Sequence, residues 1–127
     1  MTSAGIDILL AEDDEDLREA MVDTLHEAGY TVAAVGNGRD ALEWLEDSAV
    51  APKLILLDLM MPIMDGWQFL DERKKTPRAA AVPVLVLSAN GDFAGENDTI
   101  GFMRKPIAVK SLLAVLARYC TGAPPVG

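Results

Sequence analysis

Residues that can carry a charge or donate a hydroxyl follow several short apolar runs of this sequence. They are Glu12, Asp13 and Asp14 after the run that ends at Ala11, Asp58 after Leu57, Ser88 after Leu87, and Lys105 shortly after Met103. Carboxylates, a hydroxyl and an amine are the groups that bind divalent cations and phosphoryl oxygens. The chemistry that these residue types indicate is therefore that of oxygen ligands and phosphate.

The acidic residues predict a site for a hard cation. Two or three carboxylates in one place repel each other and shift each other's pKa values unless a cation lies between them. Oxygen ligands without His or Cys favour magnesium or calcium over zinc, and magnesium keeps water molecules that a phosphate can replace. Lys105 and the Ser88 hydroxyl can donate to phosphoryl oxygens, and an aspartate can itself be the nucleophile that forms an acyl phosphate. Together these residues predict phosphoryl capture.

The elements that position these residues alternate along the chain. Apolar runs rich in Ile, Leu and Val predict strands buried on both faces, at residues 6–11, 31–35, 54–57 and 84–87, with 100–103 as a weaker fifth strand. Helical spacing of apolar residues predicts helices between these strands. The residues that mark these helices are Leu17, Met21, Leu25 and Ala28 before Gly29; Ala41, Leu42 and Leu45 after the turn at 36–38; Trp67, Phe69 and Leu70 after Asp65-Gly66; and Val109, Leu112, Leu113, Leu116 and Cys120 after Pro106.

This alternation predicts an open α/β fold with a parallel sheet covered by helices on both faces. In such sheets, ligands bind beyond the carboxyl ends of the strands. The charged and hydroxyl residues that follow the strands are therefore expected to share one site at that edge.

Composition narrows the classes of function. The chain has 127 residues, of which half are hydrophobic, and this predicts one globular domain. A net charge of −9 argues against binding to nucleic acid or to an anionic membrane surface. The single cysteine, Cys120, predicts neither a disulfide framework nor a cysteine metal site. This use of cysteine favours a reducing cytoplasm. Residues 1–11 contain no Lys or Arg, unlike a secretory signal, and no apolar run approaches the roughly 20 residues that span a bilayer, so we expect a soluble protein.

The motifs around these positions resemble the receiver domains of two-component response regulators, including chemotaxis regulators. The resemblance rests on Ile8-Leu9-Leu10-Ala11-Glu12-Asp13-Asp14, on residues 56–66 (Leu-Leu-Asp-Leu-Met-Met-Pro-Ile-Met-Asp-Gly), on Leu87-Ser88-Ala89 and on Lys105-Pro106. It covers nearly the whole chain, and the segment around Asp58 is highly specific. It implies a doubly wound, flavodoxin-like sheet of five parallel strands in the order 2-1-3-4-5. The receiver domain is expected over residues 1–120, with a flexible tail over 121–127.

The resemblance also implies a role for each site residue. Asp58 resembles the phosphoacceptor, and Mg2+ is implied between Glu12, Asp13, Asp58 and the backbone carbonyl of Met60. Lys105 is implied to contact the phosphoryl group, and its peptide bond to Pro106 is usually cis in the family. Ser88 and Phe102 resemble the switch pair, in which the hydroxyl turns toward the phosphoryl group and the aromatic ring turns inward.

One departure from the family concerns the fourth helix. The interval from Ser88 to Lys105 is shorter than usual by about five residues, or roughly one and a half helical turns. Residues 91–99 hold two glycines and no clean apolar stripe, so we expect a short turn or an irregular loop there. In many receivers this region belongs to the surface that signals or dimerises.

The leading prediction is a signalling domain rather than an enzyme, with at most self-catalysed phosphorylation and dephosphorylation. A histidine kinase or histidine phosphotransfer protein is the expected phosphodonor, an unidentified protein is the expected target, and a homodimer is a further option. Two alternatives stay open. One is a receiver-like scaffold that works without phosphorylation. The other is a phosphatase resembling the haloacid dehalogenases, but Met60 stands where that class has its second aspartate.

Overall fold

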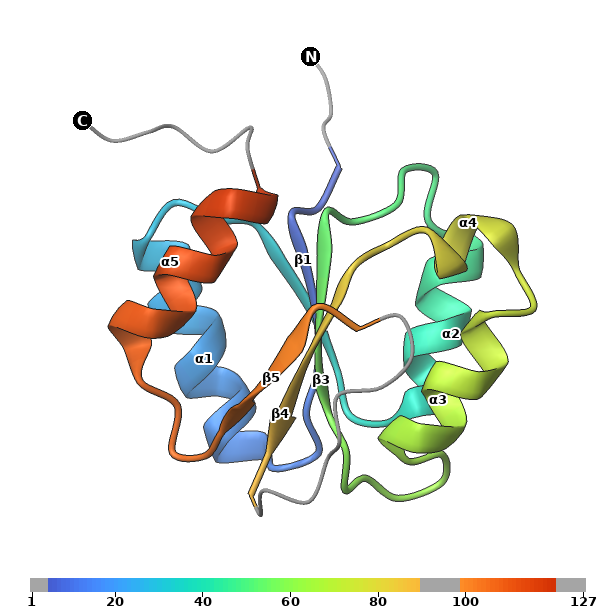
Figure 1. The fold of residues 1–127 in the computed structure, drawn as a ribbon, viewed down its shortest axis with the longest axis horizontal. Helices are drawn as coiled ribbons and strands as arrows, with labels where there is room; N and C mark the ends of the chain where they lie inside the picture. The colour runs from blue at the N-terminus through green and yellow to red at the C-terminus, as the bar shows by residue number, and fades with distance from the viewer. Residues whose placement is uncertain (1–4, 90–98, 121–127) are drawn as a thin grey trace.

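The computed structural model describes residues 5–89 and 99–120 and contains five strands and five helices within them (Figure 1). Strands and helices alternate as far as the third helix, which a fourth helix follows directly. The strands are β1 (Ile8–Ala11), β2 (Val32–Val35), β3 (Leu54–Asp58), β4 (Val84–Ser88) and β5 (Gly101–Arg104). The helices are α1 (Glu15–Glu27), α2 (Gly38–Asp47), α3 (Gly66–Arg73), α4 (Pro77–Ala80) and α5 (Val109–Tyr119). The strands and four of these helices lie where the sequence predicted them.

The five strands form one parallel sheet in the order β2-β1-β3-β4-β5. Helices α1 and α5 cover one face, and α2, α3 and α4 cover the other (Figure 1). The order of strands reverses beside β1, where successive connections pass to opposite sides of the sheet. The predicted flavodoxin-like arrangement is thus confirmed.

Alternate residues of the central strands build two cores. Leu9, Ile55 and Val84 face α2, α3 and α4 and pack with Phe69. Their sequence neighbours point the opposite way, toward α1 and α5, in a second cluster that includes Leu112. Because side chains alternate across a strand, strands covered on both faces are expected to be apolar on both sides. All of β1 meets this condition, and β3 and β4 meet it up to their last residues, Asp58 and Ser88.

The structure corrects the expected burial of β2. We expected this strand to be buried on both faces, but none of its four residues is fully buried. The reason is its position, since β2 is one edge of the sheet and has only β1 as a neighbour. The other edge strand, β5, alternates between half-buried and exposed residues, which explains its weaker apolar signal.

The sequence also failed to predict α4. This helix has only four residues and begins with Pro77, so it shows no apolar repeat that could reveal it. It lies between α3 and β4 and is not the shortened helix expected after Ser88. Most of that segment, residues 90–98, and the tail 121–127 lie outside the described residues, so both expectations stay predictions. Among the described helices, none is long and apolar enough to cross a membrane.

Local signals fix where the helices near the site begin and end. Asp14 caps α1 by accepting the N–H of Leu17 at 3.1 Å. Asp65 and Gln68 exchange hydrogen bonds in a capping box at the start of α3. Gly29, just beyond α1, has φ +99°, the left-handed conformation expected at a helix C-terminus.

Candidate functional site

The structure brings the three acidic residues predicted to bind a cation together at the carboxyl edge of the sheet. Because Ala11 of β1 pairs with Leu57 of β3, the next residues in each segment, Glu12 and Asp58, lie at the same edge. One carboxylate oxygen each from Glu12, Asp13 and Asp58 lies within 4.8 Å of the others. Glu12 and Asp58 are 1% and 4% exposed, whereas Asp13 is exposed. The cluster is therefore open to solvent at Asp13.

Lys105 reaches this cluster from the loop after β5. Its Nζ donates to Oε1 of Glu12 at 2.7 Å and lies 3.4 Å from Oδ1 of Asp58. The Lys105–Pro106 peptide bond is cis, as the family resemblance implied. The lysine amine thus contacts both of the buried carboxylates.

Burial controls the ionisation of Asp58. Removal from water raises the pKa of this carboxyl to about 6; the charge of Glu12 and a hydrogen bond with Asp13 act in the same direction, and Lys105 opposes them. Burial by itself lowers the pKa of Lys105, but the hydrogen bond to Glu12 and the charge of Asp58 outweigh it, and the pKa is raised. Lys105 therefore offsets only part of the charge at this edge.

Two contacts that sequence reasoning missed hold Glu12 in place. The backbone N–H of Asp14 donates to Oε2 of Glu12 at 3.1 Å, and Nη1 of Arg18 donates to the Glu12 carbonyl at 2.8 Å. Both donors belong to the start of α1, so the helix orients the acidic residue that precedes it. In the sequence, Arg18 stands among acidic residues and looks like one more surface charge.

The structure places the remaining predicted site residues as follows. Ser88 ends β4 beyond Leu87, the partner of Asp58 in the register, and is 4% exposed. The Ser88 carbonyl accepts the backbone N–H of Lys105 at 2.8 Å, which ties the lysine to the strand end. Phe102 lies on β5 with 40% of its surface exposed, and Met60 is 63% exposed in the loop after β3. Their roles as switch and metal ligand stay predictions.

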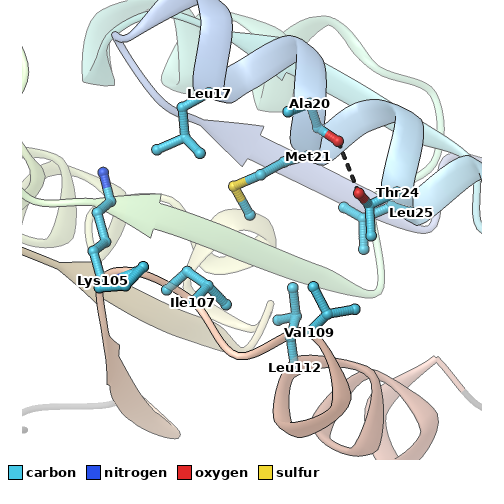
Figure 2. Close-up of a pocket in the computed structure, with 10 residues that line it drawn as sticks. Leu17, Ala20, Met21, Thr24, Leu25, Lys105, Ile107, Val109 and Leu112 are labelled. Carbon is cyan, nitrogen blue, oxygen red and sulfur yellow. Dashed lines mark hydrogen bonds between the residues drawn. The ribbon is translucent and has the colours of Figure 1, made fainter.

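An apolar pocket of about 510 Å³ adjoins the site between α1 and α5 (Figure 2). The aliphatic stem of Lys105 forms one wall, whereas its nitrogen contacts Glu12 and Asp58 outside the pocket. The Thr24 hydroxyl in the pocket donates to the Ala20 carbonyl at 2.9 Å. The other lining residues are Leu17, Met21 and Leu25 of α1, Pro106 and Ile107 of the loop, and Val109 and Leu112 of α5.

The donor set at the carboxyl edge fits a hard divalent cation. Its side-chain ligands are all carboxylate oxygens, and within the described residues the cluster contains no His or Cys. The raised pKa of Asp58 shows that the fold leaves this charge incompletely compensated. A cation beside Asp58 would supply the missing compensation.

The family model that describes the response regulator receiver domain matches residues 8–117. The chain belongs to this receiver family. Among curated relatives, a 14.6 kDa protein of Leptolyngbya boryana is 31% identical over 132 residues, which cover 98% of this chain and 97% of the relative. The transcriptional regulatory protein HprR of Escherichia coli is 38% identical over 115 residues, covering 84% of this chain but 48% of HprR. This receiver domain thus spans about half the length of that regulator.

Solved receiver domains share this fold. The receiver domain of the sensor histidine kinase PA1611 of Pseudomonas aeruginosa, with a magnesium ion in its active site cleft, is 26% identical, with a TM-score of 0.81 and coverage of 93% of this chain and 99% of that one. The chemotaxis protein CheY4 of Vibrio cholerae is also 26% identical, with a TM-score of 0.79 and coverage of 91% and 99%. The fold therefore occurs both as part of a kinase and in a chemotaxis regulator.

Proposed function

We propose that this receiver domain accepts a phosphoryl group on Asp58 from a histidine kinase or a histidine phosphotransfer protein. The observation that supports the proposal best is the position of Asp58, buried at the sheet edge between an acidic pair and the amine of Lys105. Glu12, Asp13 and Asp58, with the backbone carbonyl of Met60, would hold Mg2+. Phosphorylation then alters a surface that binds a downstream protein.

The transfer uses the carboxylate of Asp58 as the nucleophile. Because its pKa is about 6, most Asp58 side chains are ionised at neutral pH. An oxygen of Asp58 bonds to phosphorus, the bond from phosphorus to the donor imidazole nitrogen breaks, and that nitrogen keeps the electron pair. Magnesium, when bound, offsets negative charge on the transferring group. Lys105 and the Ser88 hydroxyl donate to phosphoryl oxygens.

The acyl phosphate acts as a switch in this proposal. Ser88 turns its hydroxyl toward the new phosphoryl oxygens, and the half-exposed ring of Phe102 turns inward on the neighbouring strand. A local change in charge would then shift the population of two surface states. The protein that reads this surface, or a second copy of the chain, binds one state more tightly.

The phosphodonor protein is proposed to contact the apolar pocket between α1 and α5. The pocket is continuous with the site, because Lys105 forms its wall and also contacts Asp58. Ala20 is an exposed residue of this surface, so Ala20→Glu should slow transfer from a phosphohistidine protein at least tenfold while labelling by acetyl phosphate stays within twofold. Unchanged transfer from the phosphohistidine protein in Ala20→Glu would show that the pocket does not contact the protein donor.

The two alternatives make different predictions. A phosphatase of the haloacid dehalogenase class would release phosphate from esters with many turnovers, but Met60 stands in place of the second aspartate that this class requires. If the chain is a scaffold, the wild type and Asp58→Asn should bind the partner with the same affinity. Among the described residues, no contact at the site favours either alternative over phosphoryl capture.

Intact-protein mass spectrometry after incubation with acetyl phosphate tests the proposal directly. We expect one phosphoryl adduct that requires Mg2+ and is lost in Asp58→Asn. No adduct on folded protein that binds Mg2+ would favour the scaffold instead. An adduct that persists in Asp58→Asn would show that another residue is the acceptor.

A further inference from the structure

Gly38, the first residue of α2, lies against the loop that follows the proposed phosphoacceptor. Its backbone N–H donates to the Met64 carbonyl at 2.8 Å. A Cβ built on Gly38 would lie 2.7 Å from that carbonyl oxygen, 2.9 Å from Cγ of Met64 and 3.1 Å from Cβ of Phe69. The glycine is not required by its own backbone, since its φ lies outside the left-handed region. It is required because the loop approaches too closely for any side chain.

The loop in contact with Gly38 is in a strained conformation. Ile63 has φ +68°, which is rare for a β-branched residue, and the Met64 N–H donates back to the Pro62 carbonyl at 2.6 Å. Such a turn persists only where surrounding contacts hold it. Gly66 donates to the Leu59 carbonyl at 2.9 Å from the far end of the loop. Gly38 adds a contact from a different helix.

We propose that Gly38 is a positioning residue for the metal site: its N–H and its missing side chain hold the loop between β3 and α3 so that the Met60 carbonyl can bind Mg2+. The inference rests on the proposed function, because Met60 is a ligand only in that proposal. Gly38 is not one of the residues proposed to bind the cation or the phosphoryl group. It acts through Met64, four residues after Met60 in the same loop.

Substitution of Gly38 by alanine would displace the loop. Real Cβ atoms essentially never approach another atom to less than 3.0 Å, and the nearest atom here belongs to the backbone, which cannot rotate away like a side chain. The Met64 carbonyl must therefore move by several tenths of an ångström, and its hydrogen bond to Gly38 weakens. Residues that orient metal ligands from outside typically contribute about 10- to 100-fold to metal affinity. We expect Gly38→Ala to weaken Mg2+ binding about tenfold.

The matched control is Gly29→Ala. This substitution also destabilises the fold, because Gly29 has φ +99°. Unlike Gly38, however, Gly29 has no atom within 4 Å of its built Cβ. Gly29 follows α1 and lies at the opposite edge of the sheet. Mg2+ affinity is measured for both variants and the wild type by following backbone amide signals in an NMR titration. An affinity lowered about tenfold in Gly38→Ala and within twofold of wild type in Gly29→Ala supports the proposal. Wild-type affinity in Gly38→Ala overturns it.

A second measurement needs no variant and applies even if Gly38→Ala does not fold. Coupling between two sites is reciprocal, so a contact that favours Mg2+ binding must itself be stabilised by Mg2+. Saturating Mg2+ should slow hydrogen exchange of the Gly38 amide more than that of Gly29, whose N–H donates to the His26 carbonyl. Equal slowing at both amides would overturn the proposal.

The two failures can be told apart. If the wild-type chain binds no Mg2+, the proposed function fails, and the Gly38 inference fails with it. If wild type binds Mg2+ and is phosphorylated on Asp58, while Gly38→Ala binds equally well, only the inference about Gly38 is wrong.

Discussion

Replacement of Asp58 by asparagine should make the metal-free protein more stable at neutral pH. The raised pKa of Asp58 means that the folded state binds a proton at this carboxyl more tightly than the unfolded chain does. The contribution of Asp58 to stability is therefore fully present below about pH 4 and is lost as the pH rises through about 6. Asparagine has nearly the same shape and does not titrate, so it avoids this loss.

The size of the stabilisation expected for Asp58→Asn follows from the pKa shift of Asp58. A change from 3.8 to about 6 is about two pKa units. At 1.36 kcal/mol per unit, this corresponds to at most about 3 kcal/mol. Solvent that enters at the exposed Asp13 lowers the effective cost, and Asp58→Asn also loses the ion pair with Lys105, so we expect a gain of about 1–2 kcal/mol.

Urea unfolding in EDTA at pH 7 and at pH 4.5 measures this effect. The difference between Asp58→Asn and wild type should be largest at pH 7 and should shrink as the pH falls, because wild-type Asp58 becomes protonated. Added Mg2+ should stabilise wild type more than the variant and reduce the difference. A variant that is no more stable than wild type at pH 7 in EDTA would refute the argument.

Asp7→Asn is the matched control. Asp7 precedes β1 at the opposite edge of the sheet, where its carboxylate accepts the Thr31 N–H at 3.0 Å and lies 3.4 Å from Nζ of Lys53. Its charge is compensated by these contacts, so its loss should destabilise the fold by about 0.5–1.5 kcal/mol. Replacement of Asp by Asn should therefore raise the free energy of unfolding at Asp58 and lower it at Asp7.

Three further outcomes test other contacts. Lys105→Met removes the partner of the buried Glu12 carboxylate, so we expect it to lower the free energy of unfolding in EDTA by about 1–3 kcal/mol, measured by urea titration. Ile63→Gly relieves the positive φ in the loop after β3, which costs about 1–3 kcal/mol, and adds freedom to the unfolded chain worth about 0.4–1 kcal/mol. The thermal midpoint should therefore rise, with a net gain of about 0.5–1 kcal/mol. Burial and the charge of Asp7 raise the pKa of the Cys120 thiol to about 11, so iodoacetamide at pH 8 should label it only after unfolding in denaturant.

The sequence predicted the central strands because their physical requirement is severe. A strand covered by helices on both faces must be apolar at every position, and β3, with its four apolar residues before Asp58, shows this directly. Edge strands have a weaker requirement, so the burial predicted for β2 on both faces was wrong and β5 gave only a weaker apolar signal. The grouping of Glu12 with Asp58 at one edge followed from the parallel arrangement alone, whereas their distances did not.

Features that depend on three-dimensional proximity left no readable pattern. The sequence around Gly38 indicated only a turn, but the glycine begins α2, and the constraint comes from the carbonyl of Met64 in a distant loop. Arg73 is similar. It belongs to a stretch of charged residues at the end of α3, yet it is 1% exposed, and its guanidinium donates to the Val82 carbonyl at 2.8 Å. A charge pattern does not show which member of the stretch turns inward.

The contrast between the two edges of the sheet bears on function. At the edge where the strands begin, the Asp7 carboxylate accepts a hydrogen bond from the Thr31 N–H and lies beside Lys53, and both contacts offset its charge. At the edge where they end, Asp58 shares one lysine with Glu12, and its pKa is raised. If the acidic composition alone were the cause, poorly compensated negative charge would be expected at both edges of the sheet. Because Asp58 shares one lysine with a second buried carboxylate whereas Asp7 has Lys53 and a backbone N–H, the weaker compensation at Asp58 is better explained by a ligand that binds there than by the overall charge of −9.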